Sequence, residues 1–301
     1  MSVALLYGAV ILIWGSSWIM IKFQLGVVSP EVSVAYRFAL ASVVMFAWAL
    51  TYGLPLRFSL RNHACIALQG MLICSMNFYL LYSAGYFLTT GLIAVIFSTA
   101  SALTLIINAA LERTWPKPNV AVGVMLGILG IAIIFWPELT AIAAPNVAAE
   151  TAAGLTLALA GTLSFALGGI VTARNHAAGL SVRGSTAWAM LYGTLLLMVI
   201  AGLTGESFTF DFTFPYVASL IYLALIASVI GFACYFGLLS RIGTDRAAYV
   251  TVLFPIVALS LSTLFENYQW TELALLGVAL TLLGNVLVLM PRARSFQIGS
   301  V

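Results

Sequence analysis

Long apolar segments separated by short polar connections run through the whole chain. The first extends over residues 3–21 and is ended by Lys22, and the second extends over 31–52. The run at 64–111 then carries no charge. As one helix it would be about 70 Å long, more than twice the thickness of a bilayer's hydrocarbon core. We therefore expect a hairpin with its break in "SAGYFLTTG" (83–91), where glycines and threonines cluster.

The remainder of the chain continues this alternation. A fifth apolar segment lies between prolines 118 and 137, and a stretch rich in polar and small residues follows it. Five further apolar segments come next, at 152–173, 184–204, 214–240, 246–265 and 272–290. The pattern predicts ten transmembrane helices in four parts: a first repeat at 1–137, a linker at 138–151, a second repeat at 152–290 and a cytoplasmic tail at 291–301.

The first apolar segment contains "IWGSSWIM", which places two indoles, a glycine and two hydroxyls where lipid would otherwise be the neighbour. Small residues in membrane helices usually mediate packing, so Gly15 and Ser16 are expected to let helices approach. Trp14 and Ser17 are i, i+3 neighbours on one face. Because polar side chains tend to face the interior of a helix bundle, we expect that face to look into a pathway.

The composition places the chain among integral membrane proteins. It is 63% hydrophobic and 7% charged, whereas soluble domains carry about 25% charged residues. The net charge of +3 is too small to indicate a nucleic-acid partner. The three cysteines and two histidines have no spacing typical of a disulfide framework or a metal site, so we expect neither a metal nor a cofactor.

Positive charge is divided unevenly between the two sides that ten helices would define. Lys22 would lie on one side, Arg37 sits inside the second segment, and the other ten of the twelve basic residues would share the side of both termini. Since cytoplasmic loops carry the Lys/Arg excess, we expect both termini to be cytoplasmic. The ten are Arg57, Arg61, Arg113, Lys117, Arg174, Arg183, Arg241, Arg246, Arg292 and Arg294.

The two groups of segments end alike. A shift of 154 residues places "LERTWPKPNVAVGVMLGILGIAIIF" (111–135) on "FENYQWTELALLGVALTLLGNVLVL" (265–289), aligning Glu112 with Glu266 and a glycine pair in each. Glycines seven residues apart share a helix face, where backbones can approach closely. Five helices per group is an odd number, so the groups cross the bilayer in opposite directions. We predict two inverted five-helix repeats, typical of secondary transporters, with a substrate site near mid-depth.

Taken in order, these features resemble the ten-helix, EamA-like branch of the drug/metabolite transporter superfamily. The resemblance covers nearly the whole chain. It includes "WGSSW" (14–18), Pro30 with Arg37 at the start of the second helix, the acid-ended fourth and ninth helices, and the glycine-faced fifth and tenth. "LFPIVALSLSTLFE" (253–266) is similar to the ninth helix of that family. Two positions depart from the pattern: Ser101 aligns with Pro255, and Phe165 stands where many members carry tryptophan.

The resemblance implies an exporter of amino acids or other small metabolites in the bacterial cytoplasmic (inner) membrane. The aromatic content is most similar to the YddG-like aromatic amino-acid exporters. The family's cavity is lined mainly by helices 1, 3, 4, 6, 8 and 9, which carry here the expected substrate-binding residues Trp14, Ser17, Asn77, Tyr79, Tyr82, Ser98, Ser101, Phe165 and Tyr249. Rings with a few hydroxyls suit an amphipathic zwitterion. Expected hinge or gating residues are Gly85, Gly91, Gly237, Gly243 and Pro255.

Several of these residues also have a purely structural interpretation. Ser98 and Ser101 could equally serve helix packing. Trp and Tyr near span ends are usually interface anchors, the reading we favour for Trp115, Trp136, Tyr216 and Trp270. Trp14 and Tyr79 lie well inside their segments, which favours the cavity.

Arg37 is the one full charge inside a predicted span. It could reach the interface, form an ion pair, or bind a substrate carboxylate. No acid falls in mid-span, and because proton-coupled carriers commonly use intramembrane acids or histidines, this favours facilitated diffusion.

Other classes of function are less well supported. Phosphorylated or nucleotide sugars would call for basic residues in the cavity, and only Arg37 is available. A membrane enzyme would need paired aspartates, H-E-x-x-H or a serine with a buried histidine, and none of these occurs within the spans. A channel-like pore stays open as an alternative, as does the oligomeric state.

Overall fold

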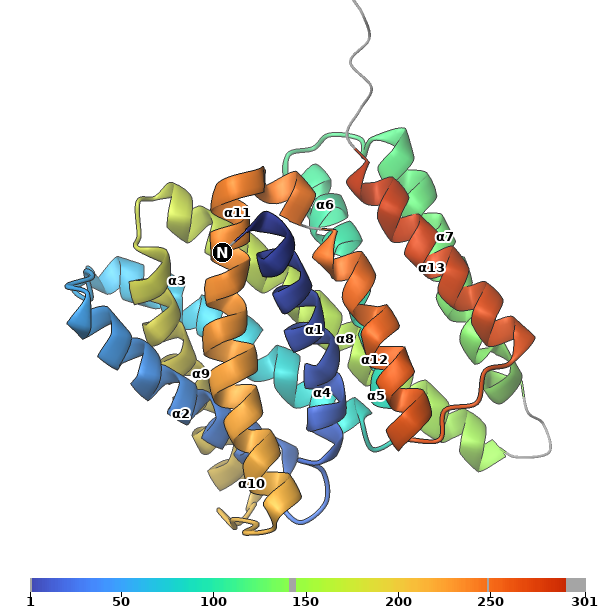
Figure 1. Cartoon of the computed structure of the whole chain (residues 1–301), viewed down its shortest axis with the longest axis horizontal. Helices are drawn as coiled ribbons and strands as arrows, with labels where there is room; N and C mark the ends of the chain where they lie inside the picture. The colour runs from blue at the N-terminus through green and yellow to red at the C-terminus, as the bar shows by residue number, and fades with distance from the viewer. Residues whose placement is uncertain (1, 141–144, 248, 291–301) are drawn as a thin grey trace, which may run out of the picture.

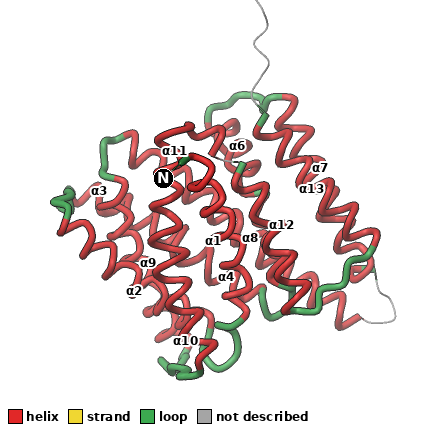
Figure 2. The backbone as a smooth tube through the Cα atoms, viewed as in Figure 1, coloured by secondary structure: helices red, strands yellow, loops and turns green. Residues whose placement is uncertain are grey.

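The computed structural model describes residues 2–140, 145–247 and 249–290, most of which are helical (Figures 1 and 2). The first half contains α1 (Val3–Lys22), α2 (Pro30–Thr51), α3 (Leu60–Gln69), the π-helical segment η1 (Gly70–Asn77), α4 (Phe78–Ala84), α5 (Thr90–Ser98), α6 (Ala100–Leu111) and α7 (Pro118–Leu139). The second half contains α8 (Pro145–Ala177), α9 (Val182–Thr204), α10 (Phe214–Ile221), the π-helical segment η2 (Tyr222–Ile230), α11 (Gly231–Ala247), α12 (Val250–Phe265) and α13 (Glu272–Leu289).

Several of these helices form continuous rods that cross the bundle. Within the described residues, nine segments are long and apolar enough to span a membrane, and α12 is a tenth that is shorter. One rod, Leu60–Ala84, comprises α3, η1 and α4. The uncharged run breaks between Ala84 and Thr90, inside the stretch predicted for the hairpin. The all-α membrane fold predicted from the hydrophobic pattern is confirmed.

Two helices extend further than hydropathy indicated. α8 begins at Pro145, inside the stretch expected to be a linker, and α11 continues to Ala247, past the expected connection near Arg241. Hydropathy marks only the part of a helix that lipid surrounds, whereas a helix can continue into the polar layer. Proline is well tolerated in the first helical turn. Residues 141–144 of the expected linker and the predicted tail, 291–301, lie outside the described residues.

Local capping explains where several helices begin and end. The side-chain oxygens of Ser2, Ser59, Ser181 and Thr271 each accept a hydrogen bond from a backbone N–H in the first turn of the helix that follows. Such caps satisfy donors that have no partner within the helix. α9 ends at Gly205, whose φ of 77° is in the left-handed region that favours glycine.

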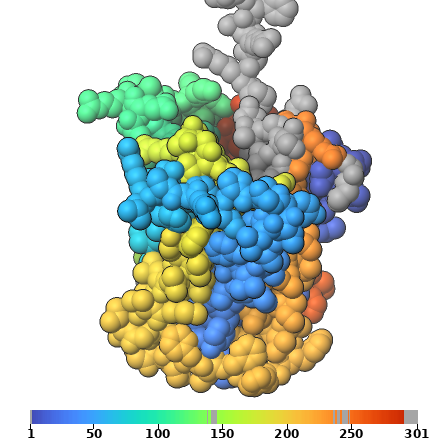
Figure 3. Space-filling view, turned by 90° about the vertical axis from the view of Figure 1, so that its left-hand side faces the viewer, coloured from blue at the N-terminus to red at the C-terminus, as the bar shows by residue number. Residues whose placement is uncertain are grey.

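The bundle has two sides, which we call upper and lower as they lie in Figure 1. α1 begins on the upper side, where the connections at 52–59, 112–117 and 178–181 also lie. The connections at 23–29, 85–89, 205–213 and 266–271 lie on the lower side. α2 packs along α9 from one half to the other, and both helices are seen side by side, in blue and yellow, on the face shown in Figure 3.

α7 and α13, the last helices of the two halves, form the tightest pair. A Cβ added to Gly123 would collide with the backbone of Gly284, and one added to Gly130 would collide with that of Gly277. The helices are antiparallel, and the shift of 154 residues exchanges the two contacts. The same shift places η1 over η2, so both halves carry a π-helical segment at corresponding positions, a feature often found at functional sites.

Candidate functional site

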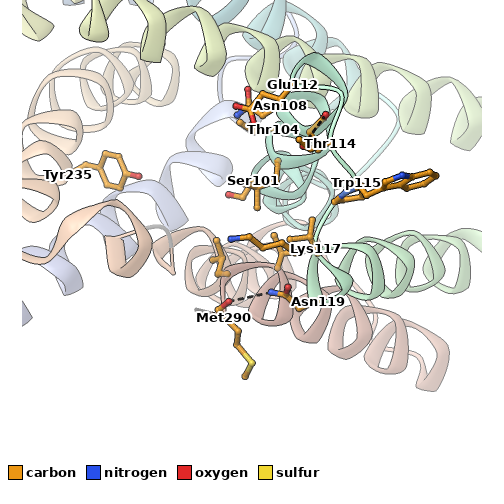
Figure 4. A pocket seen from close by; sticks show the side chains of 16 residues that line it. Ser101, Thr104, Asn108, Glu112, Thr114, Trp115, Lys117, Asn119, Tyr235 and Met290 are labelled. Carbon is orange, nitrogen blue, oxygen red and sulfur yellow. Dashed lines mark hydrogen bonds between the residues drawn. The ribbon is translucent and has the colours of Figure 1, made fainter. Parts of the chain in front are cut away.

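A pocket of about 650 Å³ is lined by α6, by the upper connection at 112–117 and by the end of α13 (Figure 4). One wall is α6, which presents Ser101, Thr104, Asn108 and Glu112 in successive turns. These residues recur at intervals of three or four along α6, so they share one helix face. Polar side chains therefore run from the mouth of the pocket towards mid-depth. Further lining residues are Trp115, Lys117, Asn119 and Val120 after the helix, and Val288 to Met290 of α13.

An aromatic residue, Tyr235, lines the side of the pocket that faces α6. Tyr235 of α11 points across the pocket towards Ser101 (Figure 4). Trp14 of α1 packs against Tyr235, with ring centroids 4.9 Å apart, and against Phe232 at 5.6 Å. Trp14 can approach this closely because Gly231 lies beside its indole. The expected cavity residues Trp14 and Ser101 are therefore brought to the same region.

A ring cluster lies at mid-depth, beyond the inner end of the pocket. Phe97 contacts Phe165 with ring centroids 4.8 Å apart, Trp18 at 5.3 Å and Phe254 at 6.3 Å. These four rings come from α5, α8, α1 and α12. Phe97 is one turn before Ser101 on nearly the same face. The ring cluster therefore lies about one helical turn deeper than Ser101, the innermost residue of the α6 wall.

A carboxylate joins the two halves at the lower end. Glu266, the residue after α12, accepts hydrogen bonds from the Thr90 backbone N–H at 2.9 Å and from the Thr90 hydroxyl at 2.7 Å. The Ser262 hydroxyl donates to the same oxygen at 2.7 Å. Gly91 allows this contact, since an added Cβ would collide with Ser262 and Leu259. A negative group at a helix N-terminus is favourable, so Glu266 fastens α5 to α12.

Other polar contacts cross the lower side. The buried Gln24 side chain donates to the backbone oxygen of Tyr216 at 2.8 Å and to the Ser219 hydroxyl at 2.6 Å. The Tyr216 hydroxyl bonds with Ser33 at 3.1 Å. Tyr216 is only 2% exposed, so our expectation that it anchors the interface is wrong. The sequence showed only that Tyr216 lies near the end of a span, and it gave no sign that the Tyr216 hydroxyl has a hydrogen-bond partner inside the bundle.

The corresponding acid on the upper side is in a different state. Glu112 is exposed on the pocket wall, and among the described residues its carboxylate has no hydrogen-bond or ion-pair partner. Between α6 and α12, the hydroxyls of Ser101 and Thr251 are hydrogen-bonded at 3.4 Å. The two ends of the bundle thus differ: Glu266 joins α5 and α12 at the lower end, whereas Glu112 faces a pocket at the upper end.

Several expected cavity residues lie away from the pocket. Ser98 accepts a hydrogen bond from the Asn285 amide of α13 at 2.7 Å, and Ser17 donates to the Trp14 backbone oxygen. Asn77 is fully buried in η1, where its amide donates to the Ile73 backbone oxygen at 3.3 Å. Tyr79 of α4 is half-buried against the large core cluster, and Tyr249 directly precedes α12 without a side-chain capping bond.

Tyr82 belongs to a cluster around Arg37, which is 4% exposed. The Arg37 guanidinium donates to the Ser228 hydroxyl through Nε and Nη2, each at 3.2 Å, and to the Tyr82 hydroxyl at 3.4 Å. It also lies 4.2 Å from the centre of the Phe78 ring. Arg37 thus does not reach the interface, and no carboxylate among the described residues pairs with it.

The expected hinge residues occupy two kinds of place. Gly85 ends α4 and Gly91 lies in the first turn of α5, so they flank the hairpin connection. Gly237 and Gly243 lie within the α11 helix and not at its end, while Pro255 is buried inside α12. The sequence predicted a connection between residues 240 and 246, but the backbone stays helical through this stretch and up to Ala247.

Sequence reasoning named Phe165 but missed the other three rings of the cluster and Tyr235. Trp18, Phe97 and Phe254 are ordinary aromatic residues in apolar segments, and nothing local distinguishes them from lipid-facing rings. Their position in mid-span, away from the interface that aromatic anchors favour, is the one pattern that could have identified them.

Comparison with known proteins finds a matching family model and several relatives. The model of the EamA-like transporter family matches residues 1–136 and 152–290. A relative from Escherichia coli (strain K12), named "Probable amino-acid metabolite efflux pump", is 26% identical over 91% of this chain and 90% of its own length. Another from the same organism, "Uncharacterized inner membrane transporter YedA", is 26% identical over 93% and 90%. Protein PagO of Salmonella typhimurium is 23% identical over 97% and 94%.

A solved structure with the description "Crystal structure of protein" also superposes on the chain. Its TM-score is 0.65 at 15% identity, and the match covers 95% of this chain and 96% of that one. The likeness extends over the whole fold.

Proposed function

This chain belongs to the EamA-like transporter family, and we propose that it exports amino acids with aromatic or neutral side chains by alternating access. The observation that carries the proposal is a pocket lined by the upper connection at 112–117, with a ring cluster at mid-depth and the Glu266–Thr90 contact at the lower end of the described residues. A carrier must close one side while the other is open, whereas an open pore needs neither closure. Inverted repeats supply two such states.

The chemistry of the pocket supports an amino acid as substrate. Ser101, Thr104 and Asn108 offer hydrogen-bonding groups, and Tyr235 offers a ring. Its volume lies within the roughly 300–1,000 Å³ usual for small-molecule sites. Its mouth carries Glu112 and Lys117, one acid and one base, which suits a zwitterion better than a phosphate. The name of the first Escherichia coli relative agrees with this substrate class.

We assign the substrate contacts to residues around the inner end of the pocket. Trp14 and Tyr235 would stack against an apolar side chain, Ser101 would hydrogen-bond the polar end, and Phe165 would receive the substrate as the ring cluster opens. Aromatic stacking of this kind is worth about 0.5–1.5 kcal/mol beyond area burial. Tyr82, Asn77 and Ser98 are engaged elsewhere in this conformation and take no direct part in this assignment.

We further propose that the upper side faces the cytoplasm of a bacterial cell. The described connections on that side include those with Arg57, Arg113 and Lys117, in line with the Lys/Arg excess of cytoplasmic loops. A relative is named as an inner membrane transporter. The pocket would then open towards the compartment from which an exporter takes its substrate.

Counterflow in liposomes tests the proposed function. Purified protein is reconstituted into liposomes, and the liposomes are loaded with each of twenty unlabelled amino acids in turn. The entry of labelled phenylalanine or leucine is then followed. We expect saturable exchange with aromatic and neutral amino acids. Exchange no faster than in empty vesicles across the whole panel contradicts the proposal, and flux that does not saturate favours a pore.

Trp14→Ala tests the assigned site. Loss of a stacking ring is expected to weaken substrate affinity about three- to tenfold, consistent with roughly 0.5–1.5 kcal/mol. Trp136→Ala is the control, because Trp136 is 63% exposed and far from the pocket lining. Equal half-saturation concentrations for the two variants would return Trp14 to a packing role.

A further inference from the structure

We propose that Glu266 and Glu112 act as two alternating latches, Glu266 holding the lower end closed in this conformation and Glu112 holding the upper end closed in the opposite one. The inference rests on the alternating-access part of the proposed function. It adds the residues that set the balance between the two states. It does not depend on which substrate is carried.

The Glu266 carboxylate is held by donors from both halves. Its two oxygens receive the Thr90 backbone N–H at 3.2 and 2.9 Å, and one of them also receives the Thr90 and Ser262 hydroxyls at 2.7 Å each. Hydrogen bonds to a charged group are stronger than neutral ones. Glu266 is partly buried here, so water competes poorly for these donors. The contact links α5 of the first half directly to α12 of the second.

This contact depends on a close approach that exists only when the lower end is shut. Gly91 faces Ser262 and Leu259 with no room for a Cβ. If the α4–α5 hairpin moved away from α12, the Thr90 N–H and hydroxyl would lose the carboxylate together. Breaking the latch and opening the lower side are therefore one event.

The inverted repeat provides the second latch. The shift of 154 residues places Glu266 on Glu112 and Ser262 on Asn108, so each acid has a polar side chain one turn before it on its own helix. Glu112 and Asn108 both line the open pocket. If these acids served only to cap a helix, both would be engaged in every state. Instead one is fully bonded and the other has no partner among the described residues, as expected when one end is closed and the other open.

Distances across the lower side test this in the full-length protein. Spin labels at Tyr86→Cys and Gln269→Cys, both exposed on lower connections, are measured in liposomes by pulsed electron resonance. The background carries Cys65→Ser, Cys74→Ala and Cys234→Ala. We expect one short distance in the parent, and in Glu266→Gln a second, longer distance with at least about a tenfold larger population.

Two further variants separate a latch from a structural cap. Glu112→Gln is expected to reduce the population that shows the longer distance. The double variant, Glu112→Gln with Glu266→Gln, is expected to have populations close to those of the parent. Glu272→Gln is the matched control, because Glu272 is an exposed acid on the lower side in the first turn of α13, outside both α5 and α12. Thr90→Val removes one hydroxyl and keeps the backbone bonds, so about a threefold shift is expected even if Glu266→Gln folds poorly.

The populations in Glu266→Gln and Thr90→Val decide the question. If both match the parent, the latch is overturned, whether or not thermal stability falls. The liposome exchange assay is read separately. A population shift without amino-acid exchange would retain the latch and reject the substrate class, while exchange without a shift would reject the latch and retain the transporter.

Discussion

Two contacts between the halves use glycine in different ways. In the α7–α13 pair, two glycine contacts lie seven residues apart along each helix, and in each contact the added Cβ would strike backbone. In the α5–α12 contact, one glycine, Gly91, meets α12 at the lower end only, where the Glu266 latch also lies. A pair fixed at two points along its length cannot hinge, whereas a pair held at one end can. We therefore interpret the α7–α13 pair as a rigid scaffold and the α5–α12 contact as a gate.

The largest effect is expected from breaking the scaffold. Gly130→Ala places a methyl group against the Gly277 carbonyl and Thr281, neither of which can move aside. Overpacking of this kind costs about 1–3 kcal/mol of stability. We expect a cost at the upper end of that range, measured as a fall in the thermal midpoint of unfolding. Gly127→Ala on the same helix is the control, since its nearest neighbour is a methyl group of Thr99 at 3.8 Å. Equal midpoints for the two variants would show that α7 and α13 are not rigidly paired.

The Arg37 cluster should behave as scaffold. Ser228→Ala removes the acceptor of two guanidinium N–H groups, and a buried donor left without a partner costs about 1–3 kcal/mol. We expect a lower thermal midpoint with unchanged lower-side distances. Ser260→Ala is the control, because its hydroxyl is on an exposed part of α12 and bonds only its own helix. A shift in the distances instead would assign Arg37 to the gate.

Gly91→Ala sharpens the comparison at the gate. Its added methyl group would collide with Ser262 and Leu259 only while the lower end is closed. We therefore expect roughly a tenfold shift towards the lower-open state, about 1.4 kcal/mol, with a smaller change in thermal midpoint than for Gly130→Ala. Gly169→Ala, where nothing lies within 4 Å, is the control. Unchanged spin-label distances in Gly91→Ala would remove the distinction between gate and scaffold.

The smallest effect is expected at Ser98. Ser98→Ala deletes the acceptor of the Asn285 amide, which should lower stability by about 0.5–1.5 kcal/mol. Because Ser98 faces α13, we expect no change in the half-saturation concentration for substrate. Ser101→Ala, on the pocket wall, should raise that concentration and leave stability nearly unchanged. The reverse result would place Ser98 in the pathway and Ser101 in the scaffold.

The sequence by itself determined the class of the molecule. Long apolar segments cannot leave their backbone groups unpaired in lipid, so they must be helices, and the length of the run at 64–111 required the hairpin that the structure has. The glycine spacing in 118–137 and 272–290 predicted a face for close helix approach on each segment, and the structure shows that these two faces meet each other in α7 and α13. The acids at 112 and 266 were visible as a repeated feature, but not their purpose.

Only the tertiary structure decided which polar and aromatic side chains meet. Ser98 and Ser101 are three residues apart and look alike in the sequence, yet one bonds α13 and the other lines the pocket. Glu112 and Glu266 are equivalent in the repeat, yet one is free of described partners and the other holds α5. Periodicity states which residues share a face of a helix, but the neighbour of that face is set by how the halves pack.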